Sequence, residues 1–450
     1  MVGYNEKDVV ELGVIGMGDM GRVYAKAFAR AGWKRVNVCD IPTKYQALKD
    51  ELQGTGINVL PDGFAVARRS DYIMYCVEAA NVDKVVAAYA PATKIGAVVC
   101  GQTSVKDPEI RAFEKHVPQD VHIVTCHSLH GPGVNPAGQP LVVMRHRSND
   151  EAFRLTVRIL EALNSKIVYL SYQEHDRITA DTQVATHLAF LSMGTAWKAA
   201  AVYPWENPSY VGGLENVKTL MMLRIYSNKW HVYAGLALLN PSAKAQVRQY
   251  AQSVSELFKM MIQEDDQAFR NRIAAASEFV FGKSATTTTK GQSSMLLSDD
   301  VMDKFALSAI PRHDWKPNSH LSLLAVVDCW WKLGINPYAH LICQTPPFRM
   351  LLGSTEYLFR TPLLLEDSIV AALREKSIRA DDCEFYTATR GWVECIEQGD
   401  FEGYRARFEG TKEFFRERLD EGAKASAELI ETIAKRTAAS NSTANVHSKL

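Results

Sequence analysis

The sequence lacks an excess of charge of either sign and has no long hydrophobic run. Its 450 residues include 51 basic and 51 acidic side chains, and no basic cluster stands out. The most apolar stretch, residues 321–331, is interrupted by Asp328 and is shorter than a membrane-spanning helix, and the first eight residues form no apolar signal core. We therefore expect a globular cytoplasmic protein that binds neither nucleic acid nor membranes.

Cysteine is infrequent, and no two cysteines have the spacing of a metal-binding or redox motif. The eight cysteines are single residues without a C-x-x-C sequence. Four of them lie in apolar, strand-like segments, where a buried and reduced thiol is the usual state. His127 and His130 are close in sequence, but no carboxylate or further histidine is near them. In an extended segment they would point to opposite faces, so we expect no metal site.

The most informative feature is a glycine-rich turn in which Gly16, Gly18 and Gly21 have the spacing G-x-G-x-x-G. The apolar residues 12–15 before it are typical of a strand, and residues 22–31 after it are typical of a helix. The first glycine permits the tight turn, the second lets a pyrophosphate approach the backbone, and the third lets helix and strand pack closely. The alternative is a strand–helix joint that binds no ligand.

A second β-branched run, residues 36–39, ends at Asp40. An acid in this place commonly binds the ribose 2′-hydroxyl of NAD. Strand, turn, helix, strand and acid together predict a dinucleotide-binding site. The residues expected to contact the cofactor are Gly16, Met17, Gly18, Asp19, Met20, Gly21, Asp40, Lys44 and Glu78.

Strands and helices alternate through the first 172 residues, which predicts an α/β Rossmann-type domain with a parallel sheet covered on both faces. Further strands are expected at residues 57–60, 71–77, 96–100, 121–126, 141–144 and 166–170, and helices at 44–53, 82–90, 108–116 and 152–163. Ligands of such sheets lie beyond the carboxyl ends of the strands. The residues that follow those ends are therefore candidate site residues, and they include Glu78, residues 102–104 and residues 127–131.

Residues 173–437 have mostly helical patterns, which predict a second, α-helical domain for substrate binding and dimerisation. Helices are expected near residues 174–200, 217–224, 243–261, 266–279, 321–333, 348–358, 381–397 and 404–435. A polar loop is expected at residues 284–294, and the Ser/Asn/Thr-rich tail 438–450 is expected to be disordered.

Three side chains are candidates for chemistry, and each has a structural alternative. His187 lies on the first long helix of the second domain, where a lone histidine is commonly structural. Arg224 lies among apolar residues, where its planar fork suits either a ligand carboxylate or an internal salt bridge. Ser104 follows a strand and either contacts a substrate or caps the next helix.

Six stretches together resemble the prephenate dehydrogenases of the fungal type, from the glycine turn to about residue 359. They are residues 16–21 (GMGDMG), 101–106 (GQTSVK), 127–132 (HSLHGP), 174–176 (EHD), 186–190 (THLAF) and 223–230 (LRIYSNKW). By this resemblance His187 matches the catalytic histidine and Arg224 matches the arginine that binds a substrate carboxylate. Ser104 matches a serine that contacts the substrate hydroxyl and orients the histidine.

The resemblance implies oxidative decarboxylation of prephenate to 4-hydroxyphenylpyruvate with NADP, in tyrosine biosynthesis, by a homodimer. Neutral His187 would take the hydroxyl proton as a hydride leaves the same carbon. Arg224 would hold the pyruvyl carboxylate, and His127 would give the substrate a polar contact near the nicotinamide. Feedback by tyrosine, if present, would act at or near the active cleft.

Three alternatives stay open. The substrate could be arogenate, another NAD(P)-dependent dehydrogenase reaction could apply, or the chain could be a non-catalytic regulator that senses a dinucleotide. Ser128 and Glu78 also stand where bacterial relatives commonly have proline. Asp40 is typical of NAD binding, whereas the resemblance implies NADP. A 2′-phosphate beside Asp40 would need a cation, for which Lys44 is the close candidate, with Thr43 as a hydrogen-bond donor.

Overall fold

The computed structural model describes residues 5–282, 297–339 and 345–447, with side chains up to residue 433. The chain folds as two compact parts. The sheet domain comprises the residues up to Thr179 and Leu239–Pro241, and the helical domain comprises Ala180–Leu238 and the described residues from Ser242 onward. The polar loop predicted at residues 284–294 lies outside the described residues.

The sheet domain contains one sheet with the strand order β3-β2-β1-β4-β5-β6-β7-β8. The strands are β1 (Glu11–Ile15), β2 (Arg35–Cys39), β3 (Ile57–Val59), β4 (Tyr72–Tyr75), β5 (Val98–Gly101), β6 (His122–Ser128), β7 (Pro140–Arg147) and β8 (Lys166–Tyr169). Neighbouring strands are parallel, as predicted, except β6 and β7, which are antiparallel. Residues 129–139 between these two strands form no helix, so β7 returns in the opposite direction.

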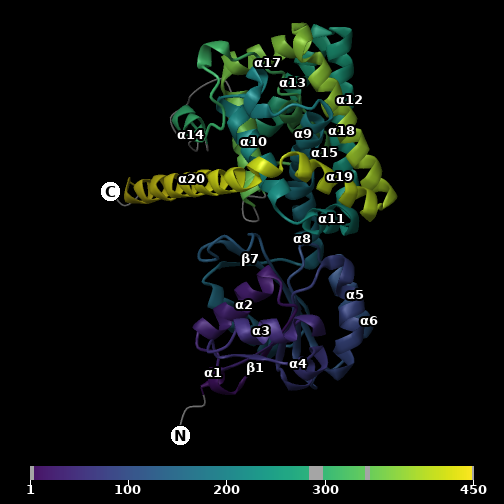
Figure 1. Cartoon of the computed structure of the whole chain (residues 1–450), viewed down its shortest axis with the longest axis vertical. Helices are drawn as coiled ribbons and strands as arrows, with labels where there is room; N and C mark the ends of the chain where they lie inside the picture. The colour runs from purple at the N-terminus through teal and green to yellow at the C-terminus, as the bar shows by residue number, and fades with distance from the viewer. Residues whose placement is uncertain (1–4, 283–296, 340–344, 448–450) are drawn as a thin grey trace. The chain divides into compact units, whose positions relative to one another are not determined.

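Helices cover both faces of the sheet. Along β1, Leu12 and Val14 contribute to the core on one face and Ile15 to the core on the other, as the alternation of side chains in a strand requires. The first face is covered by α2 (Asp19–Arg30), α3 (Tyr45–Glu51) and α7 (Asp150–Leu160). The second is covered by α4 (Gly63–Arg69), α5 (Val82–Tyr89) and α6 (Asp107–His116), of which α5 and α6 lie side by side (Figure 1). The carboxyl ends of the four parallel strands β1, β4, β5 and β6 therefore meet at one edge.

Helix α8 (Tyr172–Thr179) belongs to the sheet domain, although the boundary predicted after residue 172 places it in the second domain. The Asp176 carboxylate accepts hydrogen bonds from the amides of Lys106 and Asp107, each at 2.8 Å, where α6 begins. These bonds fix α8 to the sheet domain, and the helical domain begins at Ala180.

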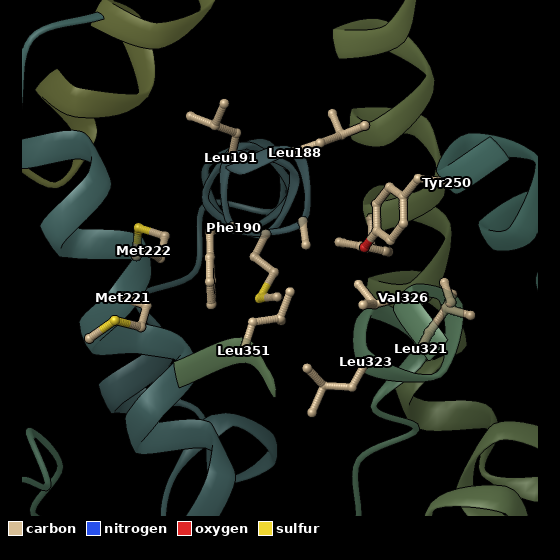
Figure 2. Packing of buried hydrophobic residues seen from close by; sticks show 14 of the residues in the cluster. Leu188, Phe190, Leu191, Met221, Met222, Tyr250, Leu321, Leu323, Val326 and Leu351 are labelled. Carbon is tan, nitrogen blue, oxygen red and sulfur yellow. The ribbon is translucent and has the colours of Figure 1, made fainter. Parts of the chain in front are cut away.

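Helix α9 (Ala185–Ala199) lies at the centre of the helical domain, directly after a π-helical turn, η5 (Ala180–Val184). Figure 2 shows α9 end on, with Phe190 directed toward Leu351 and Met222 nearby on the neighbouring helix. The other helices are α10 (Gly213–Ser227), α11 (Trp230–Leu239), α12 (Ala243–Gln263), α13 (Asp266–Phe281), α14 (Asp299–Lys304), α15 (Leu321–Leu333), α16 (Pro346–Arg360), α17 (Pro362–Arg374), α18 (Arg379–Gln398), α19 (Phe401–Phe414) and α20 (Leu419–His447). The mostly α-helical second domain is as predicted, although the sequence does not predict α11, α14 or α17.

The C-terminal segment differs from its prediction. The single helix expected over residues 404–435 is two helices, α19 and α20, separated by the short helix η11 (Arg416–Arg418). Helix α20 continues to His447 (Figure 1), through most of the tail expected to be disordered. Each residue added to an existing helix gains a backbone hydrogen bond, and the three alanines at positions 438, 439 and 444 favour that continuation.

We predict that Gly194→Ala destabilises the helical domain. A Cβ atom at this position on α9 would lie 2.5 Å from Cε2 of Tyr226 and 3.1 Å from Cγ of Met222, both on α10. Alanine usually stabilises a helix relative to glycine by up to about 1 kcal/mol, but overpacking costs about 1–3 kcal/mol. Thermal unfolding followed by circular dichroism should therefore show a lower Tm.

Gly410→Ala on α19 is the matched control. Its added Cβ would approach Nζ of Lys198, the end of an exposed and flexible side chain. The control should keep or raise the Tm. A Tm of Gly194→Ala that is equal to or above that of the original chain would contradict the close packing of α9 on α10.

Candidate active site

Two glycines of the turn are required by the packing of the sheet domain. Gly16 has φ of 98°, a conformation that favours glycine, and a Cβ there would collide with the carbonyl oxygen of Cys76. A Cβ at Gly21 would collide with the carbonyl oxygen of Gly16. β1, the turn and α2 can pack this closely only because both positions lack a side chain.

Gly18 is different, because no neighbour requires glycine there. Its φ of −67° suits any residue, and a Cβ would meet no atom within 4 Å. Gly18 is exposed and is the N-cap of α2, with no side-chain hydrogen bond to cap the helix. The space beside the first amides of α2, where Asp19 and Met20 stand, therefore fits a phosphate group held at a helix N-terminus.

Asp40 holds the glycine turn in place. Its Oδ2 accepts a hydrogen bond from the Met17 amide at 3.1 Å, and its Oδ1 accepts one from the Ile41 amide at 2.7 Å. The Met17 side chain is fully buried, and its carbonyl oxygen accepts a hydrogen bond from Arg22. Met17, predicted to contact the cofactor, therefore has its amide, carbonyl and side chain engaged within the protein.

Two cations lie near the Asp40 carboxylate. The Lys44 ammonium is 3.5 Å from Oδ2 and is more than half exposed. Arg22, the residue after the last glycine, pairs with Glu51 at 2.7 Å, and this partner together with the negative charge of Asp40 raises the pKa of the guanidinium. Lys44 was predicted, whereas Arg22 was missed although it directly follows the motif.

Glu78 lies just after β4, where it is exposed and accepts a hydrogen bond from Asn81 at 3.3 Å. It precedes the short helix η2 (Ala79–Asn81) as its N-cap residue. Glu78 is thus at the carboxyl edge of the sheet, where the sequence placed it.

Ser104 lies half-buried in the loop between β5 and α6, and a buried network fixes the loop on both sides of it. The Thr103 amide and hydroxyl donate to Glu109 at 3.1 and 2.6 Å. The Lys106 ammonium donates to Glu109 at 3.0 Å and to the Thr125 hydroxyl at 3.1 Å. The N-cap of α6 is Lys106, so the alternative that Ser104 caps this helix is wrong.

His127, near the end of β6, begins a chain of three buried side chains. Its Nδ1 is 2.8 Å from Nε2 of His175, and Nδ1 of His175 is 2.9 Å from Oδ1 of Asp176. The adjacent Ser128 faces the other side of the sheet, where its hydroxyl is 2.6 Å from that of Tyr24 on α2. Burial lowers the pKa of both imidazoles well below the usual value and raises that of Asp176 to about 6.

His175 and Asp176 were missed as site residues, although the stretch 174–176 was among those that carried the resemblance. A histidine beside an aspartate was a possible signal. Its partner His127, however, is 48 positions earlier in the chain, so only the fold shows the contact.

His187 lies in the helical domain, in an apolar pocket beside the π-helical turn. Its ring meets the ring of Tyr233 edge to face, with centroids 4.8 Å apart. The pocket is otherwise lined by Val184, Leu188, Leu191, Leu236, Ala237, Ile396 and Tyr404. Burial lowers the pKa of His187 to about 3, because this pocket offers nothing that would stabilise the imidazolium.

Arg224, on α10, is half-buried, and in the described part of the chain no carboxylate pairs with it. Its Nη1 is 3.5 Å from the Ser426 hydroxyl on α20. Asn228 donates both to the Arg224 carbonyl at 2.8 Å and to the Tyr233 hydroxyl at 3.1 Å. The alternative of an internal salt bridge therefore fails within these residues, and the guanidinium suits a ligand carboxylate. Tyr233, which contacts His187 and neighbours Arg224, was not predicted.

Neither a metal cluster nor a membrane span is found among the residues described. Across residues 5–282, 297–339 and 345–447, no three His, Cys, Asp or Glu side chains are grouped to hold a metal ion. Within the same ranges, every helix is too short or too polar to cross a bilayer.

Both domains match known families. Residues 24–169 match the family described as prephenate dehydrogenase, nucleotide-binding domain. Residues 184–435 match a family described as a 6-phosphogluconate dehydrogenase C-terminal domain. Among solved structures, prephenate dehydrogenase from Aquifex aeolicus is 18% identical over 58% of this chain and 95% of that chain, with a TM-score of 0.47.

Two curated fungal proteins are similar over nearly their whole length. A probable prephenate dehydrogenase (NADP⁺) of Schizosaccharomyces pombe is 52% identical, covering 94% of this chain and 97% of that protein. The prephenate dehydrogenase (NADP⁺) of Saccharomyces cerevisiae is 49% identical, covering 94% and 93%. Identity at this level spans both the glycine turn and the two helices that carry His187 and Arg224, and on that ground the chain belongs to the prephenate dehydrogenase family.

Proposed function

We propose that this chain oxidises and decarboxylates prephenate to 4-hydroxyphenylpyruvate with NADP, a step of tyrosine biosynthesis. The observation that carries the proposal is the identity of about half of all residues with two NADP-dependent fungal prephenate dehydrogenases across both domains. The site fits, because the chain retains a phosphate cradle at Gly18, a buried histidine chain at His127 and an arginine free of carboxylate partners at Arg224.

The substrate sets the requirements of the reaction. Prephenate carries a ring hydroxyl, a ring carboxylate and a pyruvyl carboxylate. Bound NADP supplies the nicotinamide carbon that receives the hydride from the hydroxyl-bearing carbon. The protein must remove the hydroxyl proton and align the ring, and Arg224 aligns it by holding the pyruvyl carboxylate as a charge-assisted fork. Loss of CO₂ then makes the ring aromatic and the reaction effectively irreversible.

The base is His127 in this proposal, and His187 is a neutral hydrogen-bonding group toward the substrate. The family resemblance gave His187 the role of base. A base becomes a cation when it takes the proton, and the apolar pocket of His187 opposes that charge. Burial also disfavours a charge on His127, but there a chain through His175 ends at the Asp176 carboxylate. Only His127 therefore has a carboxylate to compensate the imidazolium.

The 2′-phosphate of NADP would be held beside the end of β2 by Lys44, with Arg22 adding positive charge. Both cations lie near the Asp40 carboxylate, whose charge is already shared with the amides of Met17 and Ile41. Asp40 then supports the turn in place of binding the ribose.

The proposal also includes a cytoplasmic homodimer. The thiols of Cys100 and Cys126 lie 3.7 Å apart and are unbonded, which suits a reducing compartment. Leu363 and Val370 on α17 are exposed apolar side chains that suit a subunit contact. Light scattering on the purified protein should give twice the chain mass, and a monomeric mass would contradict the dimer. Tyrosine, which shares the aromatic ring and a carboxylate, would compete with prephenate at Arg224.

We predict that the purified chain reduces NADP when prephenate is added, and that His127→Asn lowers kcat by about 10²–10⁴-fold, the usual contribution of a general base. His187→Asn should act mainly on KM for prephenate, because it removes a contact that does not carry the proton. Absorbance of the reduced nicotinamide gives the rates, with arogenate as the alternative substrate.

The two histidine variants are matched controls for each other. A large loss of kcat in His187→Asn with a small loss in His127→Asn would return the role of base to His187. Turnover of arogenate and not of prephenate would replace the substrate.

We also predict that Lys44→Ala raises KM for NADP about tenfold, which is 1.4 kcal/mol and typical of one lost charge-assisted hydrogen bond. KM for NAD should change little, since NAD lacks the 2′-phosphate. Lys49→Ala, on the same helix α3, is the control that should leave both values as they are. Equal changes for NADP and NAD would show that Lys44 supports the turn without contacting the phosphate.

A further inference from the structure

We propose that Asp176 and His175 are positioning residues that fix the tautomer of His127, so that its Nε2 carries a lone pair toward the substrate hydroxyl. This inference rests on the proposed function, in which His127 is the base. It concerns two residues that touch neither substrate nor cofactor and that act through His127.

The chain starts from a carboxylate that can only accept. The two oxygens of Asp176 each accept a backbone amide at 2.8 Å, from Lys106 and from Asp107. With both oxygens bound in this way, the ionised carboxylate faces Nδ1 of His175 at 2.9 Å as an acceptor. Nδ1 of His175 therefore carries the proton.

The direction of the next bond follows from that proton. A neutral imidazole has one N–H and one lone pair, so Nε2 of His175 is an acceptor. Nδ1 of His127, 2.8 Å away, must then donate. His127 is left with its lone pair on Nε2, the only ring nitrogen not used by the chain.

The proton transfer balances along this chain. The substrate O–H bond breaks and an N–H bond forms at Nε2 of His127, while the hydride leaves the same carbon for the cofactor. His127 becomes an imidazolium that still donates from Nδ1 to His175. The Asp176 carboxylate stabilises that positive charge through His175, as the third member of a triad orients and stabilises its histidine.

The same carboxylate also anchors the loop that carries Ser104. Its two amide donors stand at the end of this loop, where α6 begins, and Lys106 continues from there into the buried pair with Glu109. One side chain therefore sets both the orientation of His127 and the position of the loop around Ser104.

Other charges near the chain set its pH dependence. Burial raises the pKa of Asp176 to about 6, against the lowering effect of the two amides and of the Lys106 ammonium. His127 faces His175, Lys106 and His130, which together with burial keep its pKa low and its ring neutral. As the pH falls through about 6, Asp176 gains a proton and can donate to His175, which reverses the chain. Activity should therefore fall on the acid side in a step that belongs to Asp176.

The test is Asp176→Asn, which keeps the shape and removes the charge. An asparagine amide that donates to Nδ1 of His175 would move the His175 proton to Nε2, and the His127 proton would then move to its own Nε2. We expect kcat to fall by about 10²-fold or more, as in other triads forced into the wrong tautomer. KM for prephenate and the Kd of NADP should stay within about twofold, and the acid step near pH 6 should disappear.

Nitrogen-15 NMR of histidine-labelled protein supplies a readout that needs no turnover. In the original chain Nε2 of His127 should show the shift of an unprotonated nitrogen, and in Asp176→Asn that of a protonated one. His175→Leu should lose activity as strongly, and His175→Gln, whose amide can accept and donate, should restore part of it. His116→Gln, which breaks a surface pair with Asp83 at 2.9 Å, should change neither activity nor the His127 signal.

Each outcome decides one question. An Asp176→Asn variant with kcat within threefold of the original and an unchanged His127 signal overturns the proposal. A fall in Tm with equal losses in kcat and NADP binding, and no change of tautomer, assigns Asp176 to the fold and also overturns it. If the original chain shows the expected tautomer but does not turn over prephenate, the proposed function fails and the inferred chain of hydrogen bonds stands.

Discussion

The buried Asp176 carboxylate is the interaction on which the site of the sheet domain depends. Removing a carboxylate from water costs several kcal/mol unless its lone pairs are satisfied. Here the first amides of α6 and the His175 imidazole satisfy them, and the positive end of the helix dipole adds to the compensation. The bonds join three segments, namely α8, the start of α6 and, through His175, strand β6. Loss of the charge would therefore disturb alignment before it disturbed the core.

The features that the sequence predicted well have local signals. Strands β1 and β2 are marked by apolar β-branched runs, and α15 has its predicted bounds because its apolar run ends at Gly334, which adopts the left-handed conformation of a helix cap. The features it missed depend on contacts between distant segments. The amide of Lys106 is 70 positions from the carboxylate that binds it, and the reversal of β7 depends on pairing with β6. No pattern within a short window contains that information.

His127 and His187 show why a motif alone does not assign a base. Both lie in stretches that resemble the family, and burial lowers the pKa of both. What separates them is the neighbour of the ring, which is Tyr233 for His187 and a second histidine backed by a carboxylate for His127. A neutral, apolar pocket suits a group that donates or accepts a hydrogen bond without changing charge. A compensated chain suits a group that gains a proton.

The contacts of Asp40 also explain how an acid typical of NAD sites coexists with NADP. A carboxylate free at the end of β2 would repel a 2′-phosphate. In this chain the carboxylate is only slightly exposed, accepts hydrogen bonds from the Met17 and Ile41 amides and pairs with Lys44. Its charge is therefore directed at the turn, and Arg22 adds a further positive charge nearby. The acid thus stabilises the backbone that cradles the pyrophosphate, and selection between the two cofactors passes to the cations around it.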